Sequence, residues 1–426
     1  MNYSKKIGEI GSKMLIFYPW NRRCISVLLM GLILILNSCR TKNKSIIESD
    51  FEHIGHQLSL AVSLADSNFI KVNPKSGRDP IIPRSISPEH KMIYVGTDDW
   101  CSGFFPGSLW YMYEYTKDPK WEEAAKKYTA MLEQEKNNKS THDLGFMMYC
   151  SYGNGYRINK DSSYRKILLQ TAMNLKSRYN PKLKVIRSWD FGSDVWQFPV
   201  IIDNMMNLEL LFWAFRETRD SSYFNVALNH ALTTKNNHFR ADYSTYHVVD
   251  YDTITGHVRQ KMTHQGYSDE SAWARGQAWA LYGYAMCYRE TGRTEFLDQA
   301  KNVANFLNDH QNMPPDRIPY WDFNSPKIPD EPRDASAAAI IASALFDLCK
   351  SDAKNQGEYK KIGDKIIQNL SDNYLVPQNK LFGFILNHST GSKPHHSEVD
   401  VPLSYADYYF LEALIRKSEL DKNHGN

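Results

Sequence analysis

The sequence predicts an all-α protein of the (α/α)6 toroid class, in which six buried helices form an inner ring and amphipathic helices wrap it. Six aromatic-rich segments recur along the chain, and each is apolar nearly all round, which is typical of buried helices. A helix with one apolar face follows each of the first five, and this alternation is a repeat signature. The inner helices of such a ring run parallel, so the polar residues that begin them should meet at one mouth.

The six buried segments begin with polar side chains and continue with aromatic and aliphatic ones. In chain order they cover residues 98–115, 142–156, 202–215, 273–288, 333–348 and 404–415. Between them, apolar residues recur three and four positions apart, most clearly at 224–232 and 296–307. That spacing predicts surface helices that bury one face against the ring.

The first 38 residues are predicted to be a lipoprotein signal peptide. Five basic residues precede or flank an apolar run from Ile25 to Leu36, which is too short for a comfortable membrane span. The run ends in Leu36-Asn37-Ser38-Cys39, which resembles the bacterial lipoprotein cleavage box. We therefore expect lipidation at Cys39 and a lipid-anchored location in a bacterial cell envelope, on the periplasmic side of the outer membrane. An ordinary signal peptide with a chance cysteine is the alternative.

Charge and cysteine spacing argue against several classes of function. The formal net charge is +3, and loss of the predicted signal peptide, with five basic residues and one acidic, changes it to −1. No basic excess therefore points to a nucleic-acid partner. No Cys-x-x-Cys spacing occurs, so we expect no metal site, redox motif or cofactor. The cysteines in or beside the inner segments are expected to be buried free thiols: Cys101, Cys150, Cys287 and Cys349.

Two aspartates lie at the starts of consecutive inner segments. Asp143 precedes the second segment, and Asp203 follows an apolar run at the start of the third. Either one alone could be a helix N-cap, which Asp favours. Two facing one mouth instead suggest paired carboxylates, one protonated and one ionised. The apolar flanks of Asp203, and Asp143 nearby, should raise the pKa of Asp203.

The region before the fourth inner segment is dense in polar side chains that could bind a ligand. Tyr246–Gln260 alternates in polarity and contains Thr-Gly, which predicts a β-hairpin over the mouth. It carries His247, and His264 and Gln265 follow it closely. A single histidine is more often an ordinary hydrogen-bonded residue, but the density of such side chains here favours a binding site.

An arginine and two tryptophans near helix starts suggest a carbohydrate cleft. Arg275 opens the fourth inner segment, and its planar guanidinium suits a carboxylate. Trp100 and Trp279 lie near the starts of the first and fourth segments, where flat rings could stack on sugar C–H faces. Core packing is the alternative for any one aromatic residue.

Taken together, these motifs resemble the unsaturated glucuronyl hydrolases, glycoside hydrolase family 88. The resemblance covers about Asp98 to Leu414, most of the chain after the signal peptide. Its motifs are His142-Asp143-Leu-Gly-Phe-Met, Asp203-Asn204, His264-Gln265-Gly266, Trp273-Ala-Arg275-Gly276-Gln277-Ala-Trp279 and the C-terminal Tyr405-Ala-Asp-Tyr-Tyr-Phe-Leu-Glu-Ala-Leu414. Each motif alone is moderately specific, and their order and spacing together are strong evidence for the resemblance.

The resemblance implies an (α/α)6 barrel and the hydration of an enol ether. The implied substrates are lyase-generated glycosaminoglycan oligosaccharides with a 4,5-unsaturated uronic acid at the non-reducing end. Asp203 matches the general acid/base and Asp143 its partner carboxylate. The implied substrate-binding residues are the stacking Trp100 and Trp279, together with His142, His247, Gln265 and Arg275 around the sugar hydroxyls and carboxylate. For sulfated substrates, a Ser/Lys-bearing loop matches Ser389, Ser392 and Lys393 in composition, although the lysine spacing differs.

The expected organisation is a signal peptide (1–38), an N-terminal extension packing on the ring (39–90) and an (α/α)6 catalytic domain (91–420). Within the extension, residues Phe51 to Asp66 show a short helix pattern. Membrane contact is expected only through the lipid anchor. Two alternatives stay open. An unsaturated rhamnogalacturonyl hydrolase would share the fold and act on pectin fragments. A non-catalytic glycan-binding lipoprotein would explain the aromatics and the anchor but needs no paired carboxylates.

Overall fold

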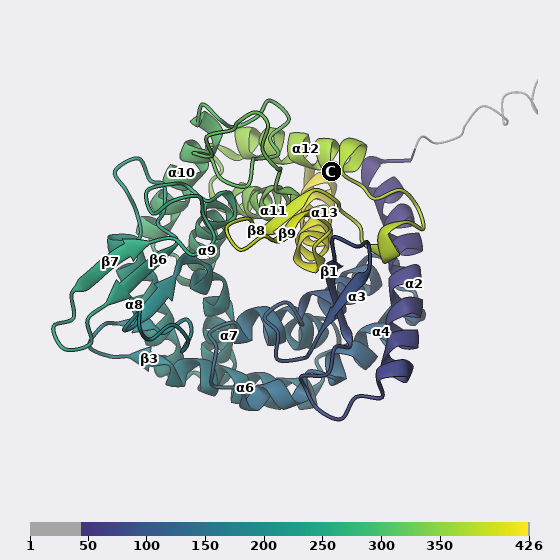
Figure 1. Ribbon diagram of the computed structural model, residues 1–426, viewed down its shortest axis with the longest axis horizontal. Coiled ribbons are helices and arrows are strands. Elements are labelled where there is room, and N and C mark those ends of the chain that lie inside the picture. Colours follow the sequence, from purple (N-terminus) through teal and green to yellow (C-terminus); the bar gives the residue numbers. More distant parts are fainter. Residues whose placement is uncertain (1–43, 425–426) are drawn as a thin grey trace, which may run out of the picture. The chain divides into compact units, whose positions relative to one another are not determined.

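The six predicted inner segments are helical and contact one another in chain order, and the last contacts the first (Figure 1). The computed structural model describes residues 44–424, so the predicted signal peptide and Cys39 lie outside the described residues. The inner elements are α3 (Phe104–Thr116), η2 with α5 (Gly145–Gly153, Asn154–Asn159), η3 with α7 (Ile202–Asn207, Leu208–Thr218), α9 (Ala274–Thr291), α11 (Ala335–Ser351) and α13 (Ser404–His424).

Burial of the inner helices follows their composition. Every residue of α9 from Ala274 to Cys287 is buried, and so is every residue of α11 from Ala335 to Cys349. Helices that are apolar on all sides gain stability only when they are enclosed by other helices. The four cysteines are buried free thiols, as predicted: Cys101, Cys150, Cys287 and Cys349.

A second set of helices covers the inner one from outside. These are α4 (Pro119–Ala130), α6 (Ser162–Ser177), α8 (Ser221–Asn237), α10 (Thr294–Asp309) and α12 (Gln356–Asn373). In each, one face is buried. Three begin in the same way, because the carboxylates of Asp118, Asp161 and Asp220 accept a hydrogen bond from the amide two residues later. This shared cap marks the helix-pair repeat.

The N-terminal helix α2 (Ile46–Val72) extends beyond the Phe51–Asp66 pattern that the sequence showed. It contacts α3, α12, β1 and the short turn η4 (Leu381–Gly383). The side chain of Gln57 is fully buried there, and its amide donates to the carbonyl of Phe384 at 2.6 Å. Among the described residues, no helix has the length and apolar character needed to cross a membrane.

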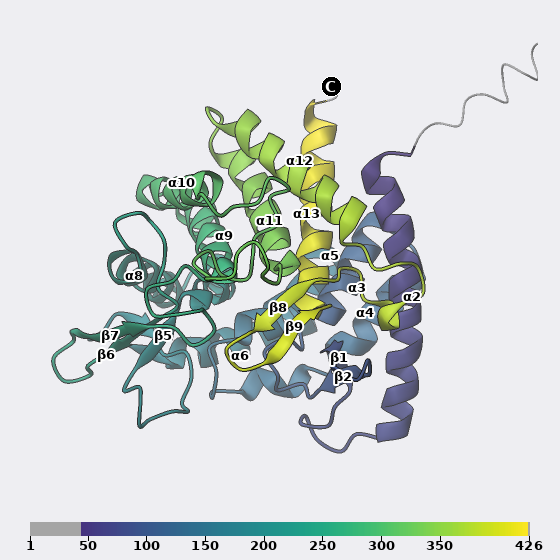
Figure 2. The same cartoon turned by 45° about the horizontal axis from the view of Figure 1, so that its top comes forward.

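Short strands gather toward one end of the ring, whereas the C-terminal end of α13 lies toward the other (Figure 2). The predicted hairpin is present as β6 (Val248–Tyr251) and β7 (Val258–Met262), and β5 (Pro199–Ile201) joins it on the other edge of β6. The remaining pairs are β1 (Ile82–Ile86) with β2 (Met92–Val95), β3 (Tyr179–Asn180) with β4 (Val185–Ile186), and β8 (Ser389–Ser392) with β9 (Ser397–Val401). A 3-10 turn, η1 (Glu133–Asn137), follows α4.

Candidate active site

The two aspartate-bearing helix starts are held against each other. The amide of Phe146 in η2 donates to Oδ1 of Asn207 in η3 at 3.0 Å. Gly145 permits this approach, since a Cβ there would lie 2.6 Å from the Asn207 backbone. Ser188 ties the preceding segments together: its carbonyl accepts from the His142 amide and its hydroxyl from the Ile201 amide. Asp143 and Asp203 are thereby brought to one place.

Asp203 lies at the end of β5, in the first turn of η3, and its side chain is 10% exposed. The pKa of its carboxyl is raised to about 7, because burial and the charge of Asp143 outweigh the opposing effects of the Arg275 cation and the Trp279 indole. Neither η2 nor η3 begins with a side-chain cap, so helix capping does not account for either aspartate. Asp203 therefore exchanges a proton near neutral pH.

Asp143 has two polar neighbours of its own. Its Oδ2 accepts from the hydroxyl of Thr141 at 2.7 Å, and its Oδ1 lies 3.2 Å from Nε2 of His142. Burial lowers the pKa of His142, so this imidazole is neutral. The charge of this carboxylate raises the pKa of Asp203, which gives the two aspartates different roles.

His247 faces Asp203 from the other side. Its Nδ1 accepts hydrogen bonds from the amides of His264 and Gln265, at 3.1 and 3.2 Å. Burial lowers the pKa of His247 well below its usual range, so the ring is neutral and its proton is on Nε2. Nε2 lies 3.6 Å from Oδ2 of Asp203. His247, one of the predicted substrate-binding residues, thus lies beside the key carboxyl.

The two tryptophans predicted to stack on sugar occupy different environments. Trp100 is partly exposed, and its ring contacts Phe104, Phe146 and Tyr405. Trp279 is fully buried in α9, and its indole N–H interacts with Asp203. The predicted exposed stacking face is therefore not observed for Trp279. Helix α9 begins at Ala274, so Trp279 lies more than one helical turn from its start and is enclosed by the ring. From this position Trp279 can hold the Asp203 side chain in place, but it does not offer an exposed ring face to a sugar.

The predicted polar ligands on β8 and its turn are mostly engaged with protein partners. Ser389 is fully buried, whereas the hydroxyl of Ser392 lies 2.7 Å from Nδ1 of His395. Lys393 pairs with Glu331, so the predicted serine–lysine set does not converge on one point.

The side chains of Arg275 and Gln265 also bond to protein atoms. The guanidinium of Arg275 is buried and bonded to Asp334, which differs from the free fork that the sequence suggested. The amide of Gln265 donates to the carbonyl of Gly391 at 3.3 Å.

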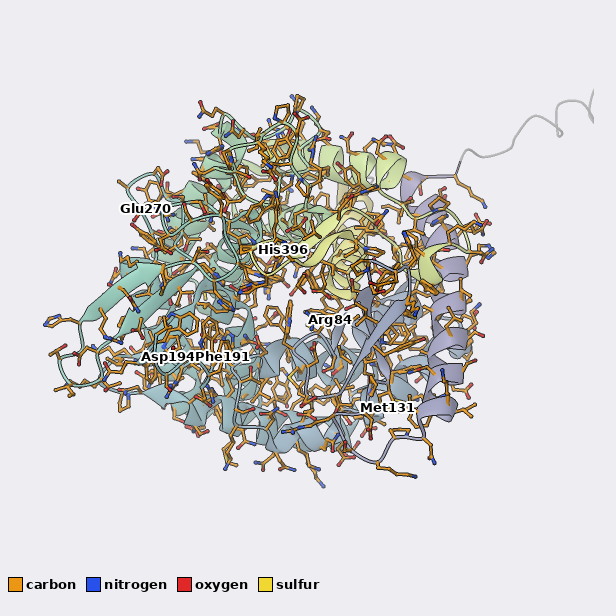
Figure 3. All side chains as sticks on the ribbon, viewed as in Figure 1. Arg84, Met131, Phe191, Asp194, Glu270 and His396 are labelled. Carbon is orange, nitrogen blue, oxygen red and sulfur yellow. The ribbon has the colours of Figure 1, made fainter. Side chains whose placement is uncertain are left out.

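An aromatic cluster beside the mouth had not been predicted. We call it the aromatic wall, and it consists of Trp189, Phe191, Trp196 and His264, whose ring centroids lie 4.9–6.1 Å from one another. His395 extends it, with its ring 4.6 Å from that of His264. Phe191 is 56% exposed on the loop before β5 (Figure 3). Three aromatics within eight residues of a glycine-containing loop were the sequence signal for it.

Comparison with known proteins places this geometry in a family. The model of Glycosyl Hydrolase Family 88 matches residues 84–415. The chain belongs to glycosyl hydrolase family 88. Within the family, it is 47% identical to an unsaturated glucuronyl hydrolase of Formosa agariphila, over 92% of this chain and 98% of that protein. It is 35% identical to an unsaturated chondroitin disaccharide hydrolase of Streptococcus pneumoniae, over 75% and 81% of the two chains.

A solved family 88 structure has the same fold. An unsaturated glucuronyl hydrolase specific for heparin superposes with a TM-score of 0.83 at 47% identity, covering 88% of this chain and 98% of that one. The family resemblance found in the motifs is therefore confirmed, and the mostly helical fold with small hairpins is common to both proteins.

Proposed function

We propose that this protein hydrolyses lyase-generated glycosaminoglycan oligosaccharides, removing the 4,5-unsaturated uronic acid from the non-reducing end. The observation that carries the proposal is the buried carboxyl of Asp203, which exchanges a proton near neutral pH beside the second carboxylate, Asp143. Family membership and the activities named for the similar proteins support the same reaction class.

The proposed chemistry uses the two carboxyl groups in sequence. Protonated Asp203 delivers its proton to C4 of the enol ether, which leaves an oxocarbenium ion at C5 stabilised by the ring oxygen. Water adds at C5 and gives its proton to the Asp203 carboxylate, so the acid is regenerated. The resulting hemiketal opens and releases the remaining sugar. The ionised Asp143 stabilises the developing positive charge, and His247 can donate from Nε2 to Oδ2 of Asp203.

Two aromatic surfaces suit the two sugars that flank the bond that is broken. Trp100, partly exposed near the start of α3, suits the ring of the unsaturated uronate. The aromatic wall, with the exposed face of Phe191, suits the leaving sugar. We assign the substrate-binding roles of His142, Gln265 and Ser392 on their positions at the same mouth.

We also assign the finer fold class as an (α/α)6 toroid. The closed cycle of contacts from α3 through η2, α7, α9, α11 and α13 back to α3 supports six inner elements. The outer helices α4, α6, α8, α10 and α12, completed by α2, support six pairs.

We propose that the chain is a lipoprotein of a bacterial cell envelope, anchored at Cys39 on the periplasmic side of the outer membrane. The support is the sequence Leu36-Asn37-Ser38-Cys39 after a short apolar run. Growth with an alkyne-tagged fatty acid should label the wild-type protein and not Cys39→Ser. Equal labelling of the two would contradict the anchor.

The activity is tested with purified protein and a panel of unsaturated disaccharides derived from heparin, chondroitin and hyaluronan. Hydration removes the conjugated double bond, so ultraviolet absorbance should fall, with Asp203→Asn as the inactive control. Saturable binding with unchanged absorbance would instead identify a glycan-binding protein. Turnover of unsaturated rhamnogalacturonides alone would identify the pectin-directed alternative.

A further inference from the structure

The guanidinium of Arg275 uses three of its five N–H groups on protein atoms, and its Nε is buried without a hydrogen-bond partner among the described residues. Its Nη1 donates to Oδ2 of Asp334 at 2.9 Å and to the carbonyl of Thr390 at 2.5 Å, and its Nη2 donates to the carbonyl of Gly391 at 2.5 Å. The side chain is 1% exposed, and Asp334 is fully buried. The edge of the planar fork formed by Nη1 and Nη2 is thus directed at the backbone of β8.

We infer that Arg275 is a positioning residue that fastens the β8–β9 hairpin to the inner ring at the mouth. The kinetic part of this inference rests on the proposed function, whereas the structural part does not.

Arg275 joins three elements through one charged group. Arg275 lies in the first turn of α9. Its partner Asp334 caps α11 by accepting from the amides of Ser336 and Ala337, and the other hydrogen bonds of Arg275 go to the carbonyls of β8. The guanidinium lies 4.5 Å from the Trp273 ring centroid and 5.2 Å from that of Tyr405. Rings on these sides restrict its orientation, so the fork holds its direction toward the hairpin.

The fastened hairpin carries residues that contact the proposed site. His395, in the turn between β8 and β9, contacts His264 of the aromatic wall, and its Nδ1 lies within hydrogen-bond distance of Ser392. Gln265 also bonds to Gly391, so the segment that orients His247 contacts the same strand. Displacement of β8 would therefore disturb both the wall and the imidazole beside Asp203.

A second arginine holds the same hairpin from its other strand and provides a matched control. Arg84 forms a two-bond contact with Glu398 of β9, at 2.7 and 3.0 Å, and also bonds to Asp99 at 2.6 Å. Arg84 and His396 of the hairpin turn both lie near the centre of the ring (Figure 3). Arg84 is not among the groups that perturb Asp203, which are Arg275, Asp143 and Trp279.

The experiment compares Arg275→Lys, Arg275→Gln and Arg84→Lys by hydrogen–deuterium exchange and by kinetics. Exchange in residues 388–401 should accelerate at least tenfold in both Arg275 variants. The kcat/KM of Arg275→Lys should fall about 10- to 150-fold, equally on an unsaturated uronide and on its carboxyl methyl ester. Arg84→Lys should accelerate exchange in 397–401 and leave the pH profile unchanged.

The pH profile separates positioning from general loss of structure. The groups facing Asp203 are the Arg275 cation, the Asp143 carboxylate and His247. Loss of the cation in Arg275→Gln should move the alkaline limb of kcat/KM to higher pH, whereas Arg275→Lys keeps a cation and should keep the limb. If the Arg275 variants do not fold, Asp334→Asn takes their place in the exchange measurement, because asparagine can still cap α11.

Two results would overturn the inference. One is unchanged exchange in 388–401 for every folded Arg275 or Asp334 variant. The other is a loss of activity confined to the charged uronide, because that would make Arg275 a carboxylate-binding residue. A wild-type protein inactive on all unsaturated uronides would refute the proposed function instead, and the exchange measurement would still test the fastening.

Discussion

At the residue scale, burial of Asp203 and the neighbouring Asp143 carboxylate raise the pKa of Asp203 to about 7, against the opposing effect of the Arg275 cation. Asp203→Asn keeps the size of the side chain but cannot supply a proton, so kcat should fall roughly 100- to 10,000-fold. Absorbance assays and circular dichroism check the rate and the fold together. Asp194→Asn, an exposed aspartate on the loop before β5, should retain full activity (Figure 3). More than a tenth of wild-type turnover in Asp203→Asn would exclude the assigned role.

Asp143 acts on the same group through its charge. Because its carboxylate raises the pKa of Asp203, Asp143→Asn should lower that pKa. The reaction needs protonated Asp203, so wild-type kcat/KM should fall as the pH rises through about 7, and in the variant this limb should move to lower pH. Profiles between pH 5 and 9 measure the shift, with Asp190→Asn on the surface loop as a control. A limb that stays in place would mean that the two carboxyls are not coupled.

At the element scale, the loop before β5 contributes the exposed edge of the aromatic wall. Phe191→Ala removes a ring that is 56% exposed and stacks on Trp189 with ring centroids 4.9 Å apart. Contacts to aromatic rings contribute roughly 0.5–1.5 kcal/mol, so KM should rise about 2- to 12-fold with kcat nearly unchanged. Steady-state kinetics on a disaccharide test this. Ile254→Ala, 77% exposed between β6 and β7, is the matched control and should change neither constant. An unchanged KM for Phe191→Ala would place the leaving sugar elsewhere.

At the scale of the whole molecule, buried neutral histidines contact the short strands near the site. His238 contacts Val200 of β5, and His230 accepts from the amide of Ile186 in β4. Burial lowers the pKa of His238 to about 3, and lowers it well below the usual range for His230 and His247. A depressed folded-state pKa contributes stability that is present above about pH 6.5 and is lost as the pH falls, because the unfolded chain binds the proton more tightly.

His238→Gln isolates one such contribution. The Nε2 of His238 lies 3.1 Å from the carbonyl of Val200, a contact that the glutamine amide can replace. The wild-type protein should lose about 2 kcal/mol of unfolding free energy relative to this variant between neutral pH and pH 5. Urea unfolding at several pH values measures it. For the control His257→Gln, at an exposed position, the plot of unfolding free energy against pH should be parallel to that of the wild type. Parallel curves for His238→Gln as well would show that His238 does not resist protonation.

Local patterns predicted most of the secondary structure. The six inner segments and the β6–β7 hairpin are encoded by neighbouring residues, because burial on all sides and strict alternation both leave a periodic trace. The full length of α2 was missed, since its exposed C-terminal part lacks a strong apolar face. β5 was missed because three apolar residues do not distinguish a strand from a buried helix start.

The sequence by itself determined the helix-pair repeat, the family and the two aspartates, because each depends on residues close together in the chain. Only the tertiary structure decided the states and partners of the site. Arg275 bonds to Asp334 and to Thr390, which are 59 and 115 residues away, and Trp279 is enclosed by the closed ring. The pKa of Asp203 likewise depends on burial by several elements together. Hydrogen-bond partners, burial and pKa shifts all depend on distances between segments that are remote in sequence. A one-dimensional pattern does not contain those distances.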